Sequence, residues 1–242
     1  MKQLLEIETQ IISLYNNFIK NFHIDKKTGY VSNSDKKLAT LPFIGSKYGS
    51  KRRVLFIGMD IGCDEHDGIT PIKQRRKDIE GLAYENLNPH IAGTYFLSLF
   101  FLRKEKEYTA IWEKVKDLNN TCQMILKHNR KELGLEEIDN CLSYVSLTNY
   151  YKFVTIDREN RAGGLDRNYL KKDDEISLLW NEIEILDPEV IFLQSQSFFN
   201  IPIRCKKHVK VIVGNHPSSR ESGTRIPRNM IETAVQIIRE IS

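Results

Sequence analysis

The sequence has few cysteines, and their spacing does not fit a metal site. No two of them form a C-x-x-C pair; they are Cys63, Cys122, Cys141 and Cys205. This pattern argues against a zinc ribbon and against a clustered iron–sulfur site. We therefore expect reduced, mostly buried thiols and a protein that works without a metal or an organic cofactor.

Long hydrophobic runs, internal repeats and low-complexity tracts are also missing. No apolar stretch approaches the length needed to span a bilayer, and the N-terminus carries acidic residues early, unlike a targeting segment. With 242 residues, 40% of them hydrophobic, the chain can bury one substantial core. We expect a cytoplasmic monomer with no membrane partner. It should be a single domain over residues 1–242, in which residues 1–50 supply an N-terminal helix and a loop packed on it.

The net charge is small, +4, but the basic residues are unevenly distributed. One segment contains a single acidic residue, Glu221, and these basic ones: Arg204, Lys206, Lys207, Lys210, Arg220, Arg225 and Arg228. Such a segment is typical of a surface that binds nucleic-acid phosphate. A second basic run, residues 73–77, fits an ordinary solvated surface equally well.

Four short apolar runs predict the strands of a parallel sheet. They are residues 53–57, 142–147, 190–193 and 209–213, and helical patterns separate them. The alternation predicts a three-layer α/β/α domain with a four-stranded parallel sheet. Helices are expected over residues 2–22, 94–104 and 108–133, after a cap at Asp173, and from Pro227 onward, whereas residues 63–92 form an irregular connection.

A polar signature follows each apolar run. The signatures are Gly58-Met59-Asp60-Ile61-Gly62, Thr148-Asn149-Tyr150-Tyr151-Lys152, Gln194-Ser195-Gln196 and Asn215-His216-Pro217-Ser218. Open α/β sheets bind ligands beyond the carboxyl ends of their strands. We therefore expect one site that collects Asp60, Asn149 and His216.

Taken together, the signatures resemble those of the uracil-DNA glycosylase superfamily, whose members cut the bond between a base and its deoxyribose. The similarity spans roughly residues 42–240, and its most specific part is His216-Pro217-Ser218. Two positions depart from the usual motifs: Ile61 replaces a proline and Gln194 replaces a glycine. The resemblance implies a DNA glycosylase that flips a base out of DNA, for repair or for antiviral defence, and leaves the branch open.

The chemistry of such a reaction assigns roles to two of the residues. Breaking an N-glycosidic bond leaves an oxocarbenium-like sugar and an anionic base, so the catalyst needs negative charge near the sugar and donors at the base. Asp60 can stabilise the cation and orient the water, and His216 can donate to a base oxygen. Each also has a structural alternative, because Asp60 can cap the following turn and His216 can order its own loop.

Recognition of the base requires a polar edge and a stacking ring. Asn149 carries a donor and an acceptor on one flat group, which suits the Watson–Crick edge of a flipped pyrimidine. It can equally satisfy backbone groups at the strand end. Tyr84 and His90 are both candidates for the ring that stacks on the base.

The first signature is expected to line the base through Gly58, Met59 and Gly62. In the best-known uracil-specific branch, a tyrosine at the position that matches Gly62 blocks substituents at C5 of the pyrimidine. Glycine leaves that side open, so the substrate is either uracil or a 5-modified pyrimidine. Gly62 can equally be a turn glycine.

Contacts to the DNA backbone are expected close to the last signature. Ser218, Ser219 and Arg220 are the first candidates for phosphate binding, and Arg225 and Lys152 are the weaker ones.

Two other classes of function remain open. Gly214-Asn215-His216 resembles a motif of the metallophosphoesterases, although the Gly-His-x-His motif of those enzymes does not occur here. A non-catalytic DNA-binding module of the same fold is the other alternative.

Overall fold

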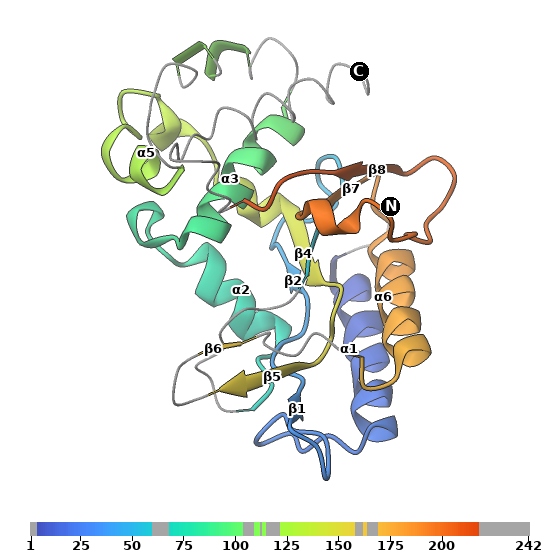
Figure 1. The fold of residues 1–242 in the computed structure, drawn as a ribbon. Coiled ribbons are helices and arrows are strands. Elements are labelled where there is room, and N and C mark those ends of the chain that lie inside the picture. The colour runs from blue at the N-terminus through green and yellow to red at the C-terminus, as the bar shows by residue number, and fades with distance from the viewer. Residues whose placement is uncertain are drawn as a thin grey trace.

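A computed structural model describes residues 4–59, 68–103, 109–111, 113–114, 122–157, 162–163 and 169–217. These residues form a mixed α/β fold around a five-stranded sheet with the order β2-β4-β3-β7-β8 (Figure 1). Four neighbouring strands are parallel; they are β3 (Val54–Gly58), β4 (Val145–Asn149), β7 (Val190–Leu193) and β8 (Lys210–Val213). The four predicted parallel strands are thus confirmed.

The sheet has one strand more than predicted. β2 (Phe43–Ile44) pairs antiparallel with β4 at the edge of the sheet. Only two residues long and preceded by Pro42, it is too short for an alternating pattern to reveal it.

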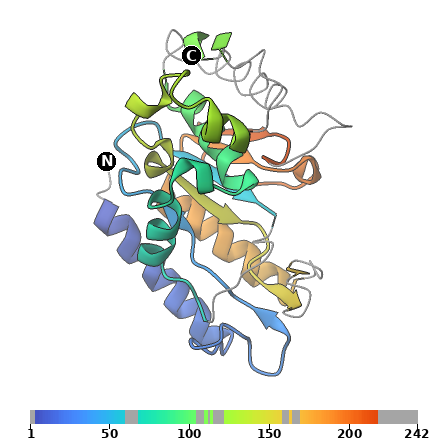
Figure 2. The ribbon, with the colours of Figure 1, turned by 90° about the vertical axis from the view of Figure 1, so that its left-hand side faces the viewer.

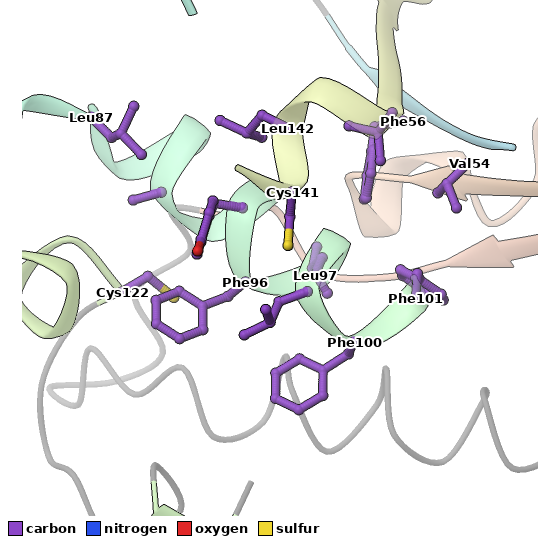
Figure 3. Packing of buried hydrophobic residues seen from close by; sticks show 14 of the residues in the cluster. Val54, Phe56, Leu87, Phe96, Leu97, Phe100, Phe101, Cys122, Cys141 and Leu142 are labelled. Atoms are coloured by element: carbon purple, nitrogen blue, oxygen red, sulfur yellow. The ribbon is translucent and has the colours of Figure 1, made fainter. Parts of the chain in front are cut away.

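One face of the sheet is covered by α3 (Pro89–Phe101) and α5 (Cys122–His128). α3 is apolar around most of its circumference, as expected of a helix packed between other layers. Figure 3 shows Phe96 and Phe100 of α3 in the same buried cluster as Cys122 and Cys141. Both thiols are free and buried, as expected, and burial raises the pKa of Cys122 to about 12 and that of Cys141 to about 11.

The other face is covered by α1 (Leu4–Asn21) and α6 (Lys172–Leu186), which lie side by side in Figures 1 and 2. Side chains of β3 alternate between the two faces: Val54 and Phe56 pack toward α3, whereas Leu55 and Ile57 pack toward α1 and α6. The described residues therefore form three layers, α/β/α, and the N-terminal helix is confirmed.

The connection after β3 contains more regular structure than predicted. It includes α2 (Ile72–Glu80) and the short 3₁₀ helix η1 (Tyr84–Asn86). α3 begins five residues before its expected start, because the Asn88 side chain accepts a hydrogen bond from the Ile91 backbone N–H and Pro89 occupies the first turn. Further 3₁₀ helices are η2 (Leu135–Glu137), η3 (Cys141–Tyr144) and η4 (Gln196–Phe198).

A second, three-stranded sheet lies at one end of the molecule (Figure 1). It consists of β1 (Lys36–Lys37), β5 (Val154–Asp157) and β6 (Ala162–Gly163). β1 comes from the N-terminal region, which ties that region to the segment after β4. No helix of the described residues is long and apolar enough to cross a membrane.

The start of α6 differs in detail from the prediction. Asp173 lies in the first turn and is not the cap. Glu175 instead accepts hydrogen bonds from the backbone N–H groups of Leu170 and Lys171, at 2.7 and 3.3 Å. The helix predicted from Pro227 lies outside the described residues.

Candidate functional site

The carboxyl ends of β3 and β7 lie at a topological switch point of the sheet, because β4 pairs on one side of β3 and β7 pairs on the other. After β3 the chain continues to α3 on one face, and after β4 it continues to α6 on the opposite face. Ligands of open α/β sheets bind in the crevice that such a reversal creates. A ligand is therefore expected at the carboxyl edge of the sheet, where the first and third signatures begin.

Gly58, Met59 and Asn149 meet at this edge. Gly58 and Asn149 are register partners in the parallel ladder. The ladder then continues past the strands, because Tyr150 N–H donates to Gly58 O at 2.8 Å and Tyr151 N–H donates to Met59 O at 2.9 Å. The first two signatures are thus adjacent, as predicted.

The loop with His216 is fixed to the end of β7. Gly214 N–H donates to Leu193 O at 2.9 Å, and Gln196 Nε2 donates to Asn215 Oδ1 at 3.1 Å. A Cβ at position 214 would lie 2.1 Å from the Phe192 ring, so only glycine allows this path. Hydrogen bonds therefore fix the third and fourth signatures relative to each other.

The first turn of α3 packs against the same loop. An added Cβ on Gly93 would lie 2.5 Å from Pro217 O, so the helix and the loop approach as closely as a glycine permits. The buried Gln194 side chain donates to Thr94 Oγ1 at 2.9 Å, and Thr94 Oγ1 donates to His90 O at 3.0 Å. These contacts fix the backbone of His90 relative to the end of β7.

Two imidazoles come together as a result. His90 Nδ1 lies 3.2 Å from His216 Nε2, and the ring centroids are 4.9 Å apart. Burial lowers the pKa of His90 to about 4, and the nearby His216 and Arg75 add to this effect. At neutral pH His90 is therefore a neutral imidazole that shares one hydrogen bond with His216.

A small polar pocket lies beside Asn149 at the end of β4. Its lining is Tyr15, Ala39, Thr40, Pro42, Arg75, Thr148, Asn149, Tyr151 and Lys152. Arg75 belongs both to this pocket and to the surroundings of His90, whose pKa its charge lowers. Arg75 thus links the Asn149 pocket to the histidine pair.

Lys152, which lines this pocket, is buried. Its Nζ lies 2.6 Å from Glu182 Oε2 and donates to Thr148 Oγ1 at 3.0 Å. Tyr15 donates to the other oxygen of Glu182. Burial lowers the pKa of Lys152, although Glu182 opposes the shift. Its burial and its pairing with a carboxylate argue against the predicted contact of Lys152 with phosphate.

Tyr84 does not lie with the histidine pair. Its ring packs edge-on against Tyr95, with centroids 5.2 Å apart, and the Arg130 guanidinium lies 4.8 Å from its centroid. Since these contacts already occupy the ring, they argue against Tyr84 as a residue that stacks on a base. Of the two candidates, His90 is the one beside His216.

The basic segment does not form one surface around His216. Arg204 lies over the Trp180 ring and Lys206 pairs with Asp187, at the amino end of β8. Both line a separate cavity of about 330 Å³ between α6 and the loop before β8. The first half of the segment is therefore separated from His216 by the length of β8, which corrects the expectation of a single phosphate-binding surface.

Several predicted site residues lie outside the described residues. They are Asp60 and Gly62 after β3, and Ser218, Ser219, Arg220 and Arg225 after Pro217. Their predicted roles remain predictions.

Sequence reasoning missed Arg75 and Glu182. Arg75 stands in a basic run that looks like a solvated surface, yet its NH1 donates to Leu41 O at 2.8 Å. Glu182 does carry a recognisable signal, because it adjoins Ile183 on the apolar side of α6 and is fully buried. A buried carboxylate requires a partner.

Among the described residues, no three His, Cys, Asp or Glu side chains are grouped so that they could hold a metal ion. A scan against models of known protein families finds no match, and a search of curated proteins finds no similar sequence.

Proposed function

We propose that the chain is a DNA glycosylase that flips a base out of DNA and hydrolyses its N-glycosidic bond, without a metal or an organic cofactor. Its substrate is uracil or a 5-modified pyrimidine, in DNA repair or antiviral defence. The observation that carries the proposal is the pairing of His216 with a neutral His90, at 3.2 Å, beyond the carboxyl ends of the sheet.

The pairing supports the chemistry in two ways. A neutral His90 presents a flat, uncharged ring on which a base can stack, and stacking holds flipped bases in other nucleic-acid sites. The hydrogen bond between the rings also fixes the orientation of His216, which donates to the departing base. Asn149 holds the base edge, and Asp60 supplies the carboxylate near the sugar.

The proposal is tested with a panel of duplex and single-stranded oligonucleotides, each with one uracil or one modified base, scored for abasic sites. Asp60→Asn and His216→Ala should lower single-turnover release by roughly 100-fold or more, as when a charge-stabilising group is removed. His208→Ala, at an exposed histidine before β8, is the matched control and should keep full activity. Full activity of either site variant would refute the assignment.

A metal-dependent phosphoesterase is the second candidate. Asp64-Glu65-His66 supplies an Asp-x-His sequence after β3 that could join His216 in binding a metal, although these three residues lie outside the described part of the chain. Metal analysis of the purified protein and assays of phosphodiester cleavage with and without Mn²⁺ separate the two. Release of free base by metal-free protein supports the glycosylase alone, whereas binding of DNA with neither reaction identifies a non-catalytic module.

A further inference from the structure

We propose that Phe199 inserts into the base stack of duplex DNA and fills the space that a flipped base leaves. This inference rests on the proposed function and adds a residue of the loop after β7 to the same site. A base that leaves the stack loses its contacts with the bases above and below it, and an apolar side chain inserted between base steps can take its place. An exposed apolar group beside the site is suited to that task.

Phe199 is exposed, whereas the residue before it is buried. Among the described residues, Phe199 is the most exposed of the large hydrophobic side chains, at 78%, and Phe198 is only 1% exposed. The ring of Phe198 packs edge-on against that of Tyr150, with centroids 5.5 Å apart. The turn of η4 thus anchors one phenylalanine against the second signature and presents the next one to solvent.

The turn that carries Phe199 is already formed in the protein without DNA. Ser195 Oγ accepts a hydrogen bond from Ser197 N–H at 3.1 Å. Phe199 N–H donates to Gln196 O, also at 3.1 Å. A side chain presented from a preformed turn loses little conformational freedom when it inserts, so most of its contact energy remains available for binding.

The same turn is fixed to the loop with His216. It follows β7 at the switch point of the sheet, and Gln196 Nε2 donates to Asn215 Oδ1 at 3.1 Å. Phe199 comes three residues after Gln196, which is about 6 Å along a 3₁₀ helix. Since one base step of B-DNA rises about 3.4 Å, a duplex bound at His216 also extends past Phe199.

The surroundings of the ring favour DNA as its partner. The neighbouring side chains of Ser197 and Asn200 are exposed, and they carry neutral donors that can bind phosphate oxygens. The sequence contains no acidic residue between Glu189 and Glu221. The segment around Phe199 therefore supplies no carboxylate of its own that would repel the DNA backbone.

The test compares duplex with single-stranded DNA, because only the duplex has a stack to be filled. The released base is uracil, or the 5-modified pyrimidine that the oligonucleotide panel identifies. Phe199→Ala should lower single-turnover release from the duplex by roughly tenfold and leave release from the single strand unchanged. Phe199→Leu, which keeps an apolar side chain, should retain most of the duplex rate. Leu5→Ala is the matched control, at a side chain of α1 that is 73% exposed, and should change neither rate.

A second measurement separates insertion from other roles of the ring. A pyrene nucleotide placed opposite the target base fills the space inside the duplex and pushes that base out. It should therefore restore the duplex rate of Phe199→Ala. The thermal midpoint of this variant should equal that of the wild type, because the ring that it removes is exposed.

Several results would overturn the inference and leave the glycosylase proposal standing. Phe199→Ala could slow release from both kinds of DNA equally or from neither, pyrene could fail to restore the rate, or the wild type could act on single strands alone. A lower mass of Phe199→Ala in solution, measured by light scattering, would instead identify the ring as a contact between two copies of the chain. If the wild type releases no base of the panel, the proposed function itself fails.

Discussion

The lowered pKa of His90 links the stability of this protein to pH. In the folded state the pKa is about 4, whereas an unfolded histidine titrates near 6.5. Between these values the unfolded chain binds a proton at His90 and the folded chain does not. The free energy of unfolding should therefore fall by about 3 kcal/mol as the pH is lowered through this window, and its full value should be present above about pH 6.5.

His90→Asn provides the comparison, since it removes the titrating group and keeps a small polar side chain in the first turn of α3. Denaturant unfolding gives the free energy of unfolding of both proteins between pH 4 and pH 7. The value for the wild type minus the value for the variant should increase as the pH rises. Parallel curves would mean that the folded His90 takes up its proton at an ordinary pH, despite the adjacent His216 and Arg75.

Removal of one partner of the Lys152–Glu182 ion pair should strongly lower the stability of the fold. Both side chains are almost completely buried, and the ammonium lies 2.6 Å from the carboxylate. Lys152→Met leaves a buried carboxylate whose main partner is lost, and should destabilise the fold by about 3–5 kcal/mol. The double variant Lys152→Met/Glu182→Leu removes both charges and should recover most of that stability. A single variant as stable as the wild type would show that Glu182 is protonated or hydrated without Lys152.

At the scale of single residues, the place of a side chain along the sheet could be predicted from the sequence better than the partners that surround it. Asn149 and His216 were predicted to lie at the edge of the sheet because each follows an apolar run, and that position depends only on local pattern. Lys152 was misread because its partner Glu182 lies 30 residues away and Tyr15 lies on another helix. No local pattern reveals which long-range partner will bury a charge.

At the scale of elements, the contact between α3 and the His216 loop should be sensitive to a single methyl group. Alanine favours an α-helix over glycine by about 1 kcal/mol. At position 93, however, a methyl group would lie 2.5 Å from Pro217 O and 2.6 Å from Pro217 Cβ, so the loop must move. Gly93→Ala should lower both the thermal midpoint and base release.

The control for Gly93→Ala is Ser98→Ala, a substitution in the same helix and also fully buried, whose side chain bonds within α3 at Thr94 O. It should lower stability with little effect on base release, because it does not touch the His216 loop. Equal losses of base release in the two variants would show that the spacing between α3 and the loop is unimportant.

The order of the elements was predictable where a pattern repeats over enough residues. Buried parallel strands and the helix near the N-terminus have such patterns, and the structure contains them. β2 and η1 are two and three residues long, respectively, and therefore carry no periodic signal. α2 was missed because Lys73, Arg76 and similar residues dominate it, and basic residues at this density read equally well as a loop.

At the scale of the whole molecule, the sequence predicted three layers but not the placement of charge around the sheet. The segment from Arg204 to Arg228 is basic along the chain, but its described basic residues before β8 lie at the end of that strand away from His216. β8 is four residues long, and a strand of that length separates its two ends by about 13 Å. This separation exceeds the distance of about 8 Å over which salt screens charges at physiological ionic strength.

The division of the basic segment leads to a prediction about DNA binding. Each phosphate that a protein neutralises releases about one condensed counterion, so the slope of log K against log salt counts the contacts. Arg220 follows His216 by four residues in the sequence, and Arg220→Ala should make this slope shallower by about one. Lys207→Ala removes the same charge from the exposed end of β8 opposite His216, so it should leave the slope unchanged.

The measurement is a salt titration of binding to an oligonucleotide without a target base. Equal changes in both variants would mean that DNA follows β8 along its whole length, and a change only in Lys207→Ala would place the DNA over Trp180 and away from the histidine pair.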